Sequence, residues 1–231
     1  MTFAFINAMH KEHEQLVQLL SNTKEKELGP FRVVEGKYGA CDVVLMESGI
    51  GKVNAALCTE ALILRFHPDV VINSGVAGSL SGKVSIGEIA LGEGVIQHDV
   101  DTSALGDPVG FVSTVNMLEF PCSAPVVDQL EQAIRDEGIP MARGVIASGD
   151  QFVTDSIKAR ILSHFDCIAC EMEAGAIGQV CYANGVDFAI LRSISDNADG
   201  SADMDYPQFC ELAADNATRV ALRFAAIHAG V

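Results

Sequence analysis

The stretch CIACEMEAGAIGQVCYANGVDFAILRSISDNAD, residues 167–199, decides the fold of this chain. Two apolar runs of strand length, 168–170 and 188–191, flank a run with helical periodicity at 174–183. We therefore predict a strand, a helix and a second strand, joined by a right-handed crossover that makes the two strands parallel. Parallel strands end at one edge of a sheet, and an acidic cleft is expected there, formed by Glu171, Glu173 and Asp196. Carboxylates gathered away from bulk water raise one another's proton affinity, so one can act as an acid while another stays ionised.

The composition is that of a single α/β domain spanning residues 1–231. Hydrophobic residues make up 49% of the chain and charged residues 20%, which fits parallel strands buried on both faces. The net charge of -16 argues against binding to nucleic acid or to an anionic membrane, and favours small neutral or cationic ligands. The apolar start is too short for a signal peptide and no run reaches membrane-spanning length, so we expect a cytoplasmic protein.

The rest of the chain continues the alternation of strands and helices. Short apolar runs predict strands at 2–6, 31–34, 43–46, 70–73, 88–91 and 144–147. Longer periodic runs predict a helix at 9–20, one opened by residues 48–52 and running to about 66, and one at 124–137. The last predicted helix is capped by Asp205, has Pro207 in its first turn and continues through 209–227. The small residues at 74–79 predict a loop in which backbone can approach a ligand closely.

Several motifs that suggest cofactors or metals are incomplete. The glycines before Lys52 lack P-loop spacing and the Ser or Thr after the lysine, so a strand-to-helix turn is favoured. Residues 74–79 lack the full dinucleotide pattern, and the histidines at 10 and 13 do not form H-E-x-x-H. Cys167 and Cys170, three apart on a strand, are expected to point to opposite faces, and the seven cysteines to be free buried thiols. We expect no metal and no cofactor.

Two further segments are candidates for the cleft. Glu12 follows the first strand and is either a first-turn acid that complements the helix dipole or a residue that faces the same cleft. Residues 148–153 follow a predicted strand and place Phe152 beside free backbone groups, a combination that can stack on and hydrogen-bond a flat base. A core position is the equally weighted alternative for Phe152, and Ser148 lacks the histidine partner that a nucleophile needs.

Taken together, these motifs resemble the 5′-methylthioadenosine/S-adenosylhomocysteine nucleosidases, within the purine nucleoside phosphorylase-like superfamily. The resemblance covers nearly the whole chain and rests on NAM at 7–9 with Glu12, SGIGKV at 48–53, SGVAG at 74–78, HDVD at 98–101, ASGDQF at 147–152, EME at 171–173 and SDNAD at 195–199. It implies a three-layer α/β fold, with a central mixed, largely parallel sheet flanked by helices. It also implies hydrolysis of the bond between adenine and a 5′-thio-substituted ribose.

The resemblance assigns roles to single residues. Asp196 matches the proton donor to adenine N7, and Glu12 matches the general base that activates water, which Arg192 helps to hold. Glu173 matches the carboxylate on the ribose hydroxyls, whose charge favours a cationic sugar in the transition state. Other positions match substrate contacts: Phe152 stacks on adenine, Val153 reads its edge, Met172 packs on the ribose, and the remainder are Val76, Ala77, Gly78, Gln151, Glu171 and Ser195.

The resemblance also predicts how the 5′ substituent is held. Met9, Ile50 and Tyr206 match the positions that line an apolar slot for this group. In the family a homodimer partner closes the slot with the loop after 98–99, which here carries Leu105 and Pro108, so we expect a dimer. The chain departs from the family pattern at Asn7, where glycine is frequent, and at Val76, where some members have serine near the water.

Two other functions compete with this one. A purine nucleoside phosphorylase would share the fold and the base pocket, but phosphate would replace water; Glu12 argues against it because a carboxylate repels phosphate. A nucleoside-binding sensor without turnover is the second alternative, and the presence of Glu12, Glu173 and Asp196 together argues against it. The sequence leaves open the preference among methylthioadenosine, adenosylhomocysteine, 5′-deoxyadenosine and aminofutalosine.

Overall fold

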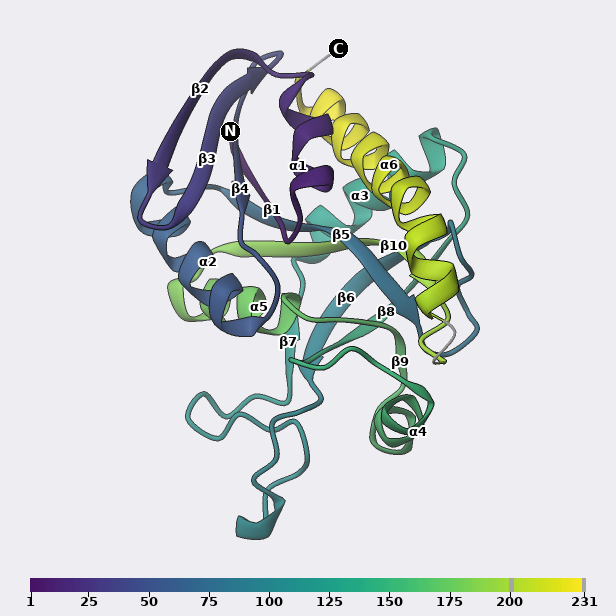
Figure 1. The fold of residues 1–231 in the computed structure, drawn as a ribbon. Helices are drawn as coiled ribbons and strands as arrows, with labels where there is room; N and C mark the ends of the chain where they lie inside the picture. Colours follow the sequence, from purple (N-terminus) through teal and green to yellow (C-terminus); the bar gives the residue numbers. More distant parts are fainter. Residues whose placement is uncertain (200–201, 230–231) are drawn as a thin grey trace.

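The computed structural model describes residues 1–199 and 202–229, apart from the side chains of residues 11, 12, 15, 202–208 and 229. Its strands form one mixed sheet with the order β10-β6-β8-β9-β5-β1-β4-β3-β2, and β7 pairs with β6 at the side (Figure 1). The strands are β1 (Thr2–Asn7), β2 (Ser21–Leu28), β3 (Phe31–Tyr38), β4 (Cys41–Glu47), β5 (Val70–Ser79), β6 (Ile89–Gln97), β7 (Glu119–Pro121), β8 (Met141–Ser148), β9 (Cys167–Glu171) and β10 (Asp187–Asp196).

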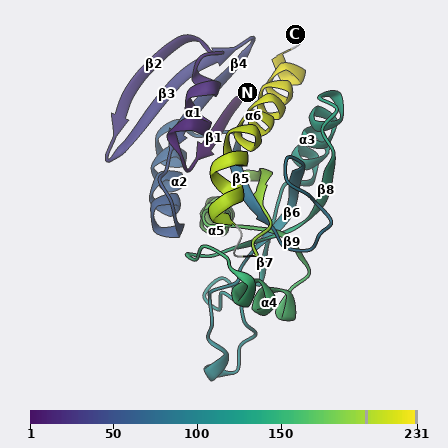
Figure 2. The same ribbon diagram turned by 45° about the vertical axis from the view of Figure 1, so that its right-hand side comes forward.

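The helices cover the sheet in two groups (Figures 1 and 2). One group consists of α2 (Lys52–Phe66) and α5 (Ala174–Asn184), which pack side by side; in the other, α6 (Ala202–Ala229) contacts α1 (His10–Val17) and α3 (Ala124–Asp136). The remaining helical segments are α4 (Asp155–His164) and the short η1 (Ser103–Leu105). Apolar strands buried between helices form the core, and β1 is buried from Phe3 onward. Within the described ranges, none of the helices combines the length and apolar character needed to cross a membrane.

Five strands pair in a closed ring, and two of them, β9 and β10, belong to the predicted strand–helix–strand unit. β5 pairs with β10, β10 with β6, β6 with β8, β8 with β9, and β9 returns to β5. The unit β9–α5–β10 exists, but the prediction of parallel neighbouring strands is wrong, since β9 pairs with β8 and β5 and runs antiparallel to β5 while β10 runs parallel to it. Only Gly78–Ser79 and Ala169–Cys170 pair in the antiparallel contact, so the carboxyl ends of β5 and β9 meet head-on.

The balance of pairings also differs from the largely parallel sheet that the resemblance implied. Among the described residues, five strand pairs are parallel and five are antiparallel. The hairpins β2–β3 and β3–β4 and the ring closures at β10–β6 and β5–β9 account for most of the antiparallel pairs. A mixed sheet is therefore confirmed, and a predominantly parallel one is not.

Several element boundaries differ from the sequence prediction. Residues 74–79 continue β5 rather than forming a loop, because their small side chains let β5 lie between β10 and β9. The first helix was predicted to reach residue 20 but ends at Val17, and Leu19, beyond its end, is 51% exposed. The last helix begins at Ala202, so Asp205 lies inside it and not at its N-cap. Strand β2 and helix α4 were not predicted.

The cysteines are free, and six of the seven are buried, with Cys210 partly exposed. The expectation that Cys167 and Cys170 point to opposite faces is wrong, since both pack in one small apolar cluster with Ile161 and Leu80. The cause is a β-bulge: Val145 pairs with Cys167 and Ile146 with Ala169, which leaves an extra residue in β9. Burial raises the pKa of Cys167 to about 12, so this thiol is neutral at physiological pH.

Candidate active site

A cavity of about 270 Å³ lies at the meeting point of the carboxyl ends of β5, β9 and β10. It is lined by Ala8, Met9, Ile50, Val76, Ala77, Gly78, Gln151, Phe152, Val153, Cys170, Glu171, Met172, Glu173, Arg192, Ser195, Asp196 and Ala198. Most predicted site residues are in this set. The motifs at residues 7–9, 48–53, 74–78, 147–152, 171–173 and 195–199 therefore converge in space.

Asp196 is the last residue of β10 and is only 5% exposed. Its Oδ2 accepts a hydrogen bond from the Ser195 hydroxyl at 2.9 Å, and its Oδ1 accepts one from the Ala198 N–H at 2.9 Å. Gly78 pairs with Asp196 across the sheet, and a Cβ at Gly78 would lie 2.8 Å from Oδ1. Glycine at this position therefore lets the carboxylate lie directly against β5.

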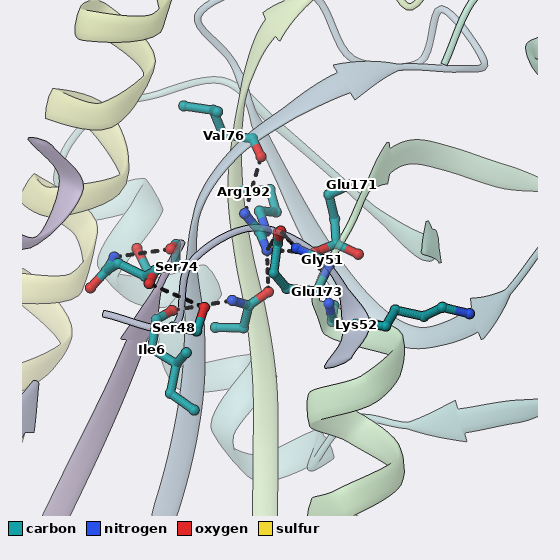
Figure 3. A network of polar contacts seen from close by, with 12 residues as sticks. Ile6, Ser48, Gly51, Lys52, Ser74, Val76, Glu171, Glu173 and Arg192 are labelled. Atoms are coloured by element: carbon teal, nitrogen blue, oxygen red, sulfur yellow. Dashed lines mark hydrogen bonds and ion pairs between the residues drawn. The ribbon is translucent and has the colours of Figure 1, made fainter. Parts of the chain in front are cut away.

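Glu171, Glu173 and Arg192 form a buried charged group at the base of the cavity (Figure 3). One Arg192 nitrogen, Nη2, donates to Glu171 Oε2 at 2.5 Å and to Glu173 Oε2 at 3.2 Å. The same nitrogen also donates to Asn73, while Nη1 donates to the Val76 carbonyl at 3.1 Å. The guanidinium thus offsets the repulsion between two neighbouring carboxylates, a role that the sequence analysis did not assign to it.

The two glutamates are further fixed by backbone groups at helix starts. Glu171 Oε2 accepts the N–H groups of Glu173 and Ala174 at 2.9 and 2.8 Å, which satisfies free donors at the start of α5. Glu173 Oε1 accepts the Gly51 N–H at 2.9 Å, immediately before α2. Both carboxylates therefore lie at positive helix ends, where a negative charge is favoured.

Apolar side chains also line the cavity. Phe152 is 55% exposed at its rim, Val153 is buried, and Arg160 holds Gln151 through its Oε1 at 2.9 Å. Ile50, 57% exposed, lies on the lining as well. Aromatic and aliphatic side chains in the same cavity as carboxylates suit a ligand with a flat ring and a polar sugar-like part.

Three lining residues were missed by the sequence analysis, namely Ala8, Cys170 and Ala198. Each adjoins a predicted residue, and that adjacency was the available signal. Cys170 lies beside Gly78, with its Sγ 3.6 Å from the Gly78 carbonyl oxygen. Burial raises the pKa of this thiol well above its usual value, so it contributes a neutral surface.

Two described residues of the predicted site, Leu105 and Pro108, do not line the cavity. Leu105 and Pro108 lie on the long connection between β6 and β7, which projects from the body of the molecule in Figure 1, and Leu105 is 85% exposed. The side chains of Glu12 and Tyr206 lie outside the described residues, although their backbones belong to α1 and α6. Asn7, a departure from the family pattern, is buried and donates to the Ser74 carbonyl at 3.0 Å.

Known proteins similar to this chain share one superfamily. The model of the phosphorylase superfamily matches residues 2–226. A 5′-methylthioadenosine/S-adenosylhomocysteine nucleosidase from an Exiguobacterium strain is 38% identical over 225 residues, 96% of each chain. The same nucleosidase from Neisseria meningitidis, solved with methylthio-immucillin-A, has a TM-score of 0.93 and 37% identity, over 96% of this chain and 97% of that one.

A second similar structure carries a different name. Futalosine hydrolase of Helicobacter pylori superposes with a TM-score of 0.93 at 33% identity, over 97% of both chains. The chain belongs to the phosphorylase superfamily and, within it, to the family of the 5′-methylthioadenosine/S-adenosylhomocysteine nucleosidases. The family resemblance inferred from the sequence motifs is thereby confirmed.

Proposed function

We propose that this enzyme hydrolyses the N-glycosidic bond of 5′-thio-substituted adenine nucleosides and releases adenine. The observation that carries the proposal is one cavity lined by Glu171, Glu173 and Asp196 together with apolar side chains that include Phe152. The substrates are 5′-methylthioadenosine and S-adenosylhomocysteine, after which its relatives are named. Departure of adenine needs a proton on the base, and the cationic sugar left behind needs a carboxylate and water.

Asp196 is the proton donor to adenine N7 in this proposal. The Ser195 hydroxyl lies 2.9 Å from Asp196 Oδ2 and 3.4 Å from the Ala77 carbonyl oxygen. When the Asp196 carboxylate is ionised, the Ser195 hydroxyl can donate a hydrogen bond to it. When Asp196 carries the proton, the hydroxyl can instead donate to the Ala77 carbonyl oxygen and accept a hydrogen bond from Asp196. Both protonation states therefore have a hydrogen-bonded arrangement, as an acid that cycles between them requires.

Glu173 binds the ribose hydroxyls and stabilises positive charge on the sugar. Its Oε2 is 3.2 Å from Arg192 and its Oε1 is 2.9 Å from the Gly51 N–H, so its position is fixed before substrate arrives. A preorganised carboxylate favours the cationic transition state over the neutral ground state. Arg192 pairs with Glu173 at 3.2 Å and, together with Glu12 as general base, holds the attacking water. Glu12 removes a proton from that water as its oxygen bonds to the sugar carbon.

Water rather than phosphate is the nucleophile. The start of α2, a typical anion site, is occupied by the protein's own acids: Gly51 donates to Glu173, and Lys52 donates through its backbone N–H to Asp150 at 2.7 Å. Among the described residues that line the cavity, Arg192 is the one basic side chain, and it is paired with two glutamates. A phosphate would meet carboxylates without a compensating cation, which disfavours the phosphorylase alternative.

The 5′ substituent lies in an apolar slot that includes Met9, Ile50 and Tyr206. The slot has no described charged group of its own, which suits a thioether and a 5′-deoxy carbon alike, so 5′-deoxyadenosine is a further substrate. Aminofutalosine is a second candidate, favoured by the close structural similarity to the futalosine hydrolase. Side-by-side specificity constants for the four nucleosides rank them.

The enzyme acts as a homodimer in this proposal. Helix α2 and the turn before it expose an apolar stripe that begins at the cavity rim: Ile50 57%, Val53 70%, Leu57 57% and Leu64 62% exposed. Leu105 projects on the β6–β7 connection, and the same connection of a second copy would bring Leu105 and Pro108 over the slot. Residues 1–231 form one catalytic domain, in which the two helix groups and the sheet between them make the three layers.

Release of adenine by the purified protein tests the proposal and separates it from a binding sensor. Incubation with 5′-methylthioadenosine should yield free adenine in multiple turnovers, and Glu12→Gln should yield none while crystals of this variant retain intact nucleoside. Tight nucleoside binding by the wild-type protein without adenine release would support the sensor. Products in crystals of the Glu12→Gln variant would refute Glu12 as the base.

A further inference from the structure

A closed charged triangle lies behind the cavity wall and outside the lining residues. Lys52 Nζ donates to Asp99 Oδ1 at 2.6 Å. The other oxygen of Asp99 accepts the Asp150 N–H at 2.9 Å, and Asp150 Oδ1 accepts the Lys52 backbone N–H at 2.7 Å. Each of the three residues is thus bound to the other two, although they come from α2, from the segment after β6 and from the segment after β8.

This triangle is not an ordinary surface ion pair. The side chains of Lys52 and Asp99 are 17% and 18% exposed, and Lys52 also donates to Gln97 at 3.2 Å. Burial alone would raise the pKa of Asp99, but the Lys52 ammonium and the Asp150 N–H outweigh it and hold the pKa below its ordinary value. The lysine is therefore paired with a carboxylate that stays ionised at neutral pH.

Two of the segments joined by the triangle carry opposite halves of the cavity. The segment at the start of α2 reaches Glu173, the proposed ribose-binding carboxylate, because Gly51, one residue before Lys52, donates to it. The segment after β8 reaches the base side, because Gln151 and Phe152 directly follow Asp150 and line the cavity. Figure 3 shows the Lys52 side chain extending away from Glu173 and Arg192, so its ammonium is not directed at the Glu173 carboxylate.

We propose that Lys52 and Asp99 are positioning residues that set the base-binding segment 150–153 against the ribose carboxylate Glu173. The inference rests on the proposed hydrolysis of adenine nucleosides, in which one substrate must meet both halves at once. A misplacement of about 1 Å between reacting groups can cost about 100-fold in rate. The pair therefore matters most in the transition state, where the base leaves and the sugar charge develops together.

The test compares steady-state kinetics of Lys52→Met and Asp99→Asn with the wild-type enzyme. We expect kcat to fall about 10-fold or more in each variant, with KM and the dissociation constant of free adenine within about 3-fold of wild type. Lys52→Arg should recover most of the lost kcat, because it restores a cation opposite Asp99. The double variant should be no slower than the worse single variant, because both residues act through one pair.

Lys83→Met is the matched control, because it breaks an exposed lysine–aspartate pair with Asp166 at 3.1 Å and should leave kcat unchanged. The inference is overturned if both Lys52→Met and Asp99→Asn keep wild-type kcat, or if their only change is a lower melting temperature. It is also overturned if the variants lose kcat/KM only through a higher KM and a weaker affinity for adenine, with kcat unchanged. An inactive wild-type enzyme would instead refute the proposed function, so the two failures are distinguishable.

Discussion

Arg192 and Glu171 form an ion pair in the interior of the protein, with 2.5 Å between Nη2 and Oε2 and both side chains 2% exposed. The pair joins the middle of β10 to the end of β9, two strands that do not lie side by side. It supplies positive charge where two glutamates and an aspartate line one cavity. Glu171 thus holds Arg192 and the start of α5 in place.

Glu171→Gln should strongly destabilise the protein. The amide can still accept the two backbone N–H groups, but it removes one counter-charge from a buried guanidinium. Breaking a buried pair by removing one partner costs about 3–5 kcal/mol, and Glu173 keeps part of the compensation, so about 3 kcal/mol is expected. Urea denaturation measures it, with Asp166→Asn as the control that breaks an exposed pair. A loss as small as that of the control would contradict the role given to Glu171.

Gly78→Ala should reduce adenine release about 100-fold in a folded protein, because the new methyl group would lie 2.8 Å from Asp196 Oδ1 and displace the acid. Gly36→Ala is the control, since its methyl group meets Leu20 at a similar 2.9 Å on β3, away from the cavity. Activity per folded molecule should be normal in the control. Equal activity of the two variants would argue against close contact between Gly78 and the catalytic acid.

Asp196→Asn should lower kcat by about 100-fold to 10,000-fold while the nucleoside still binds. The amide preserves the size of the side chain and can accept the Ala198 N–H, but it cannot transfer a proton to adenine N7. Isothermal titration with 5′-methylthioadenosine measures the binding that remains. Near-normal turnover in this variant would refute the assignment of Asp196 as the proton donor.

The sequence predicted the elements that have a clear apolar period. Helix α2 was predicted to open within residues 48–52 and to run to about Phe66, and it spans Lys52–Phe66. It ends where His67 adopts a left-handed conformation with φ of 47° before Pro68. Strand β2 was missed because it reads SNTKEKEL and is almost entirely exposed, so only its pairing with β3 makes it a strand. Helix α4 was missed because Ile161 is its one buried residue. An exposed strand or helix has no apolar period in the sequence, so it cannot be predicted from one sequence when only its contacts with other segments define it.

The cavity residues were predicted for reasons that were partly wrong. Glu171 and Asp196 do approach one cavity, but through the antiparallel meeting of β9 with β5 and not through parallel neighbours. The closure of a five-strand ring depends on contacts between distant segments, which local periodicity does not encode. The triangle of Lys52, Asp99 and Asp150 was invisible for the same reason. Motif resemblance supplied most of the site, and the catalytic roles remain proposals.

Asp99→Asn should also change how stability depends on pH. The pKa of Asp99 in the folded protein lies below its ordinary value, so its ionised form stabilises the fold above pH 3.8, and this contribution is lost as the pH falls through the lowered pKa. The wild-type advantage in unfolding free energy should therefore be constant above about pH 5 and shrink as the pH falls from there through 3.8 and below. Urea titrations across this range measure it. A pH-independent difference would contradict the ionised pair with Lys52.

Leu57→Glu should convert the proposed dimer to a monomer and reduce activity. The substitution places a charge in the centre of the exposed apolar stripe on α2, where association would have to bury it. Light scattering coupled to size-exclusion chromatography measures the mass. Leu19→Glu changes a similarly exposed leucine outside α2 and serves as the control. A wild-type monomer with full activity would contradict closure of the slot by a second copy.

The most direct test of the central claim is a phosphate titration of the wild-type reaction with 5′-methylthioadenosine. We predict that adenine is released at full rate in phosphate-free buffer, that added phosphate does not accelerate it, and that ³¹P NMR detects no sugar 1-phosphate. A rate that rises from near zero in proportion to phosphate, with sugar 1-phosphate as product, would contradict hydrolysis and establish phosphorolysis instead.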